Sequence, residues 1–172
     1  MSPRELSLGE CAPFYTRYID QVPDHVSIHH ALLLAESEVV TLVEKLPEEV
    51  GNHRYAEGKW SIKEVLLHMT DTERIFANRA LRIARGDRTS LPGFEQDDYV
   101  PHSFANERSL ADIMEERNAV RLSTLLLFKS FQHSVLANLG QADHKAISVR
   151  AIGYIISGHD LHHLAVVKER YL

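Results

Sequence analysis

Apolar residues recur at steps of three and four positions over four long stretches of the chain, the spacing expected of amphipathic α-helices. The first stripe comprises Ile28, Leu32, Ala35, Val39, Leu42 and Leu46. Asp24 is suited to cap this helix, and Pro47 limits its end. The pattern therefore predicts a helix that starts behind Asp24 and ends before Pro47.

The second and third helices begin at recognisable capping residues. Ser61 followed by Glu64 three residues later is the capping-box pattern, and Gly86 ends the second apolar stripe. Ser109 precedes the third stripe, which continues to Gly140. A helix of that extent would be about 45 Å long.

The connecting segments are polar and rich in proline and glycine. Residues 1–23 contain three prolines and are predicted to form an irregular N-terminal arm, while residues 47–60 and 140–148 form loops. Residues 87–106 form a longer loop, of a length that is often functional and that is suited to a crossover connection. No stretch shows useful strand-like alternation. We therefore expect residues 1–172 to form one all-α domain, an up-and-down-like four-helix bundle.

Composition and charge restrict the classes of partner. The 172 residues carry a formal net charge of −5 without a cluster of lysine and arginine, which disfavours nucleic-acid binding. The single cysteine, Cys11, allows no intrachain disulfide, and no apolar run reaches the length of a membrane span or follows Met1 as a signal peptide would. We expect a cytoplasmic protein with no membrane partner.

The fourth apolar stripe contains two histidines. It comprises Val149, Ile152, Ile156, His159, His163 and Val166. Buried imidazoles need partners for their ring nitrogens, and a His-x-x-x-His pair on one helix face can share a divalent metal ion as that partner. The alternative is a pair of core histidines that hydrogen-bond to polar neighbours. His162 lies off the stripe, so we take His159 and His163 as the inward pair.

A third nitrogen donor lies on the second helix. His68 is at the edge of that helix's apolar stripe, on the same face as Thr72. Alone it would be interpreted as a half-exposed polar residue. Together with His159 and His163 it completes three neutral nitrogen donors on two helices, and three protein ligands are typical of open, catalytic metal sites.

Two segments resemble motifs of a known family. Residues 58–71 resemble the second-helix signature of the DinB/YfiT-like superfamily of candidate metalloenzymes, in which a tryptophan is followed eight residues later by a metal-binding histidine. Trp60 and His68 have that spacing. Residues 159–163 resemble the fourth-helix motif, which supplies the other two histidines. The resemblance spans most of the chain, although only these two motifs are specific.

The resemblance implies a four-helix bundle in which His68, His159 and His163 bind zinc, nickel or a related ion. It also implies a small-molecule substrate, because related members include transferases and isomerases that use low-molecular-weight thiols, and it raises the expectation of a homodimer. One position departs from the pattern: Glu73 stands where some thiol-transferase-like members have a further histidine.

Two charged residues near the predicted site have alternative interpretations. Glu73 falls near the centre of the second helix's stripe. In a functional role it would be a general base or the hydrogen-bond partner of a ligand histidine. The alternative is an ion pair with Arg117. Arg79 lies on the His68 face and is either a clamp for a substrate carboxylate or an exposed residue paired with Asp71 or Glu95.

Other histidines are weaker candidates. His25 and His29 also have i, i+4 spacing, but they lie at the positive end of a helix dipole and lack a third donor. Four further histidines are interpreted as surface residues: His53, His102, His133 and His144.

Two functions from different classes fit these features. The first is a divalent-metal-dependent enzyme that acts on a small molecule by hydrolysis or by thiol (S-)transfer. The second is a non-catalytic metal- or ligand-binding bundle, which a coordination sphere closed by Glu73 or another protein ligand would favour. A DNA-damage-response role is suggested only by the family's name, and the acidic charge argues against it.

Overall fold

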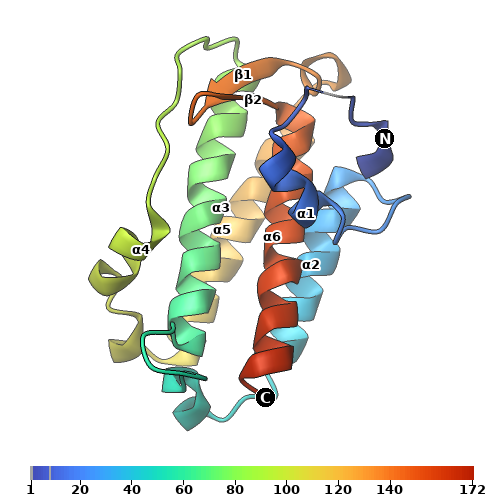
Figure 1. Cartoon of the computed structure of the whole chain (residues 1–172). Helices are drawn as coiled ribbons and strands as arrows, with labels where there is room; N and C mark the ends of the chain where they lie inside the picture. Colours follow the sequence, from blue (N-terminus) through green and yellow to red (C-terminus); the bar gives the residue numbers. More distant parts are fainter. Residues whose placement is uncertain (1, 8) are drawn as a thin grey trace.

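The computed structural model describes residues 2–7 and 9–172 and forms a four-helix bundle, as predicted (Figure 1). The long helices are α2 (Ile28–Val43), α3 (Ile62–Ala84), α5 (Leu110–Ser130) and α6 (Val149–Arg170). α6 packs against α2 and α3, and α5 packs against the same two helices. α5 and α6 therefore occupy opposite corners of the bundle.

The topology includes a crossover. α3 and α5 run in the same direction, because the chain returns along the outside of the bundle between them (Figure 1). The returning segment carries the short helix α4 (Gln96–Tyr99) and 3₁₀ turns at Val100–His102 and Ala105–Glu107. The segment expected as a long loop is therefore a crossover connection with short helical turns, and the helices do not simply alternate in direction.

The first two long helices start and end close to the predicted positions. Ser61 and Glu64 form the expected capping box of α3. The cap of α2 is Ser27, whose side chain accepts a hydrogen bond from the His30 backbone at 3.3 Å, so the prediction of Asp24 was wrong. Asp24 instead forms an ion pair with Arg4.

The end of the third helix was predicted wrongly. α5 stops at Ser130, because Phe131 adopts an extended conformation with ψ of 132°. Its 21 residues correspond to about 31 Å rather than 45 Å. After a 3₁₀ turn at His133–Val135 the chain forms an antiparallel hairpin of β1 (Leu139–Ala142) and β2 (Lys145–Ser148), where no strand was expected.

The hairpin was missed because its turn lacks the usual sequence signal. Asp143 and His144 both have positive φ, at 50° and 59°, as a two-residue turn with the twist of a hairpin requires. Asn-Gly or Asp-Gly is the common sequence for that turn. The hairpin also holds the start of the crossover through two backbone hydrogen bonds. The Leu91 N–H donates to Gln141 O at 2.9 Å, and Leu91 O accepts from the Asp143 N–H at 3.0 Å.

Two separate groups of buried apolar residues fill the bundle. One group includes Phe76 of α3 and ends at Ile156 on α6, and the other includes Met69 of α3 and begins at Leu164 on α6. The segment of α6 that contains the histidine pair therefore lies between two apolar clusters. Leu161, which lies within that segment, packs against both clusters.

The N-terminal arm is more ordered than expected. It contains 3₁₀ turns at Pro3–Glu5 and Pro13–Tyr15 and the one-turn helix α1 (Thr16–Ile19), which packs on α6. Tyr18 and Ile19 are buried, whereas Phe14 is exposed. A further 3₁₀ turn, Glu48–Asn52, joins α2 to α3. Within the described ranges, no helix combines the length and the apolar character needed to cross a membrane.

Candidate metal centre

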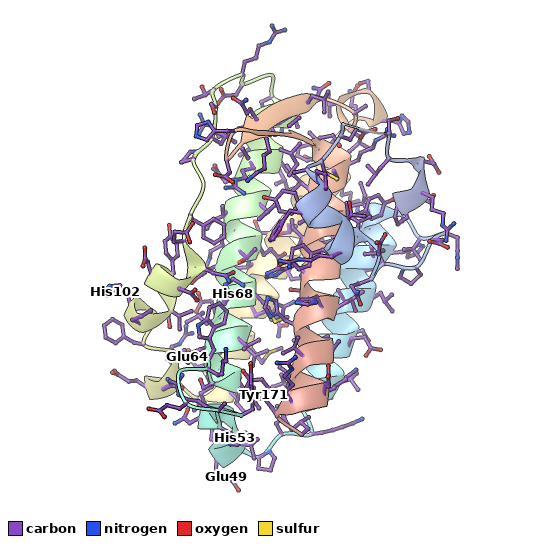
Figure 2. All side chains as sticks on the ribbon, in the orientation of Figure 1. Glu49, His53, Glu64, His68, His102 and Tyr171 are labelled. Carbon is purple, nitrogen blue, oxygen red and sulfur yellow. The ribbon has the colours of Figure 1, made fainter. Side chains whose placement is uncertain are left out.

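The structure brings His68 of α3 together with His159 and His163 of α6. The Nε2 atoms of His68 and His159 are 3.2 Å apart, and those of His163 and His159 are 3.1 Å apart. One ligand atom from each ring lies within 4.8 Å of the others. Figure 2 marks His68 on the side of α3 that adjoins α6. Two antiparallel helices thus place three imidazoles around one point.

The separations fit a divalent ion. Zinc–nitrogen bonds are about 2.0–2.1 Å long, so two nitrogens in a tetrahedral shell are roughly 3.4 Å apart. The Nε2 separations of 3.1 Å and 3.2 Å are close to that value. Three imidazole nitrogens that face one another cannot all find hydrogen-bond donors in each other, whereas one cation satisfies all three lone pairs. The donor set therefore suits a divalent metal.

The three rings are in the protonation state that a ligand needs. Burial lowers the pKa of His68 to about 4. Burial, aided by the neighbouring His68 and His162, lowers the pKa of His163 to about 3. Burial and the adjacent rings also hold the pKa of His159 well below its ordinary value. All three imidazoles are therefore neutral at physiological pH, and their lone pairs are free to bind a cation.

Neighbouring side chains fix the orientation of the rings. Thr72 Oγ1 lies 3.5 Å from His68 Nδ1, and when Nε2 is the ligand this hydroxyl is the acceptor for the Nδ1 proton. The Trp60 ring centroid lies 4.8 Å from that of His68, and the Tyr18 ring lies 5.2 Å from that of His159. The tryptophan of the family motif thus packs directly on its histidine.

A buried layer of charged residues lies between the two apolar clusters and draws on all four long helices. Arg121 donates to both carboxylate oxygens of Glu73, at 2.9 and 2.8 Å, and to Asp160. Arg117 donates to Asp160 at 2.6 Å and to Glu36 at 2.9 Å. The predicted pairing of Glu73 with Arg117 was therefore wrong. Arg121, one turn further along α5, is the arginine that faces Glu73.

The sequence offered only a weak signal for this layer. Arg121 was not singled out, because a lone arginine on a mixed helix is usually solvent-exposed. Asp160 lies in a run of residues, 151–160, that are all buried, and it is adjacent to His159. A carboxylate in such a run indicates a buried ion pair, and the two arginines at i, i+4 on α5 supply it.

A pocket of about 310 Å³ opens beside the histidines, a size typical of sites for small molecules. His68 and His159 form part of its lining, as does Arg79 on the same face of α3. The prediction of an exposed Arg79 paired with Asp71 or Glu95 was wrong, since this residue is 3% exposed and Asp71 pairs with Arg74. Residues 14, 15, 17 and 18 of the N-terminal arm and residues 93–97 of the crossover also line the pocket.

The remaining candidates lie outside the cluster. His162 is half-buried beside Tyr18, and His25 and His29 are exposed. Among the aromatic residues of the crossover, Phe94 lines the pocket, while Phe104 is 62% exposed.

Helix α1 covers the site because Gly158 has no side chain. A Cβ at Gly158 would lie 1.9 Å from the backbone oxygen of Tyr18. Replacing Gly158 with alanine should therefore displace α1 and open the pocket, because the backbone oxygen of Tyr18 can move only if the helix moves with it. Hydrogen–deuterium exchange should rise in residues 14–20 and remain low in α3.

Gly153 provides the matched control for this prediction. A Cβ there would meet the Ile28 side chain at 2.5 Å and the Phe128 ring at 3.0 Å, and both side chains can adjust. Gly153→Ala should leave exchange in residues 14–20 unchanged. Equal exchange in the two variants would show that Gly158 does not position α1.

The bundle and the site together define a helical protein with a three-histidine candidate metal centre. Residues 31–167 match the family model described as the DinB superfamily, and the chain belongs to that superfamily. No curated protein matches it. YfiT from Bacillus subtilis has a similar solved structure, with a TM-score of 0.71 and 12% identity over 83% of this chain and 82% of that chain. YfiT is described as a probable metal-dependent hydrolase with an unusual four-helix bundle topology.

Proposed function

We propose that this protein is a divalent-metal-dependent hydrolase of a small molecule, with His68, His159 and His163 as the metal ligands. The observation that carries the proposal is the convergence of three neutral Nε2 atoms at the edge of a pocket of about 310 Å³. The description of YfiT as a probable metal-dependent hydrolase is consistent with it. Imidazole nitrogens favour zinc or nickel over the harder calcium and magnesium ions.

The arrangement favours an enzyme over a non-catalytic metal site. A closed site needs a fourth protein ligand. Within the described part of the chain, the cluster of possible ligands has three members, and both oxygens of Glu73 are held by Arg121. The coordination shell that these residues offer is therefore incomplete on the side of the pocket.

The protein residues have distinct roles in this proposal. A divalent ion bound there would act as a Lewis acid and would lower the pKa of a bound water toward neutrality. Thr72 holds the His68 ring in the tautomer that presents Nε2. Tyr18 and the rest of α1 limit access of bulk water to His159. Glu73, engaged by Arg121, stabilises the layer beside the site rather than moving a proton.

The test is metal-dependent turnover. Tag-free protein would be stripped with a chelator, reloaded with Zn²⁺ or Ni²⁺, and assayed against a panel of esters and amides. We expect hydrolysis that disappears on chelation, returns on reloading and is absent from His68→Ala. Fully loaded protein that hydrolyses none of the panel would count against the proposal, and transfer to a low-molecular-weight thiol in place of water would define a transferase instead.

A further inference from the structure

Arg79 is a buried cation without a carboxylate partner. It is 3% exposed, and no carboxylate in residues 2–7 and 9–172 lies within ion-pair distance of it. The nearby Asp143 forms its ion pair with Lys145. Buried charges in proteins are ordinarily paired, because an isolated ion loses its hydration without compensation. Burial accordingly lowers the pKa of Arg79.

The guanidinium of Arg79 is held in a fixed position. Its Nη2 donates to Pro92 O at 2.7 Å, and its charge lies 4.8 Å from the Phe76 ring centroid and 5.8 Å from that of Phe94. Tyr15 lines the same pocket. A guanidinium has five N–H donors, so several remain for a ligand in the pocket. The side chain is thus oriented without being neutralised.

Arg79 and His68 line the same pocket at different positions along α3. Arg79 follows His68 by eleven residues, or about 16 Å of helix. Arginine side chains on a helix lean toward its N-terminus, which brings the guanidinium to a distance on the order of 10 Å from the histidine nitrogens. The pocket wall between the two ends includes Phe76, with Tyr15 and Phe94 facing it from other segments. Aromatic side chains therefore line the pocket together with Arg79 and the candidate metal ligands His68 and His159.

We propose that the pocket binds an organic carboxylate, with the carboxylate on Arg79, an apolar segment against Phe76 and Phe94, and the reacting group at the three histidines. The buried, unpaired guanidinium of Arg79 matches one planar, singly charged carboxylate in charge and in fork geometry. The assignment of the reacting group rests on the proposed hydrolase function. Recognition of the carboxylate does not, because it requires no metal.

The experiment therefore uses metal-free, full-length protein at low salt. Calorimetric titration would compare 4-phenylbutanoate with its neutral amide, 4-phenylbutanamide, which has nearly the same shape. We expect the carboxylate to bind at least tenfold more tightly than the amide. Removing the metal excludes direct coordination of the carboxylate and separates this result from any failure of hydrolysis.

Variants assign the preference to Arg79. Arg79→Gln should abolish it, and Arg79→Lys, which keeps the charge but not the fork, should retain only part of it. Arg82→Gln is the matched control, because Arg82 lies three residues further on α3 and pairs with Asp87. Circular dichroism would establish that each variant is folded. If Arg79→Gln does not fold, Arg79→Lys still tests the proposal. Equal binding of acid and amide, absence of carboxylate binding at millimolar concentration, or an unchanged preference in both Arg79 variants would overturn the proposal.

Discussion

Replacing His163 with alanine should reduce affinity for a divalent ion by more than about 100-fold. Mutating residues that only hydrogen-bond to metal ligands already lowers metal affinity by about 10–100-fold. The protein should nevertheless stay folded. The two apolar clusters lie on either side of the histidine segment of α6, and His163 belongs to neither of them. Elemental analysis and calorimetric titration with Zn²⁺ would measure the first effect, and circular dichroism the second.

His162 supplies the control for this prediction. It is adjacent to His163 but belongs to neither the cluster nor the apolar stripe, so His162→Ala should bind Zn²⁺ as the unmodified protein does. Tight, stoichiometric binding by His163→Ala would remove this residue from the ligand set. Unfolding of His163→Ala would instead mean that the site is structural, as in small zinc domains.

Replacing Arg121 with methionine should destabilise the metal-free protein by about 3–5 kcal/mol, the usual effect of removing one partner of a buried ion pair. Arg121 is 2% exposed and Glu73 is 1% exposed. Both oxygens of Glu73 accept hydrogen bonds from Arg121, so the variant leaves a buried carboxylate without its cation. Urea unfolding followed by circular dichroism would measure the change. Metal-free protein is required because ion binding itself stabilises the folded state.

Two comparisons make this prediction specific. The double variant Glu73→Leu, Arg121→Met should be more stable than Arg121→Met alone, because it removes the stranded carboxylate as well. Arg74→Met, which breaks only the exposed pairs with Asp71 and Glu116, should cost less than about 1 kcal/mol. If Arg121→Met lowered the free energy of unfolding as little as Arg74→Met does, the structural role assigned to the buried layer of charged residues would be contradicted.

Features that depend on residues close together in the chain could be predicted from the sequence. The capping box at Ser61 and the i, i+4 spacing of His159 and His163 are local features, and both were visible in the sequence. His68 was found from its place at the edge of the second helix's apolar stripe, and the Trp60 spacing, which resembles a family motif, supported it. The end of α5 was missed, because Phe131 leaves the helix although the apolar spacing continues beyond it.

The partners of Glu73 and Arg79 could not have been assigned in the same way. Glu73 faces Arg121 rather than Arg117 because of the rotational setting of α5 against α3, which side-chain packing along the whole interface decides. Arg79 is buried because the hairpin holds Leu91, and this contact places Pro92 O against the guanidinium. Neither contact has a signature within one segment of the chain.

The sequence by itself therefore determined the helical class, the caps of α3 and the three histidines, because these depend on spacing within one turn or one motif. The tertiary structure decided the parallel arrangement of α3 and α5, the buried charge layer and the cover that α1 forms over the site. Each of these depends on contacts between residues far apart in the chain. Such contacts depend on how whole helices pack, and the sequence pattern of any one segment does not determine them.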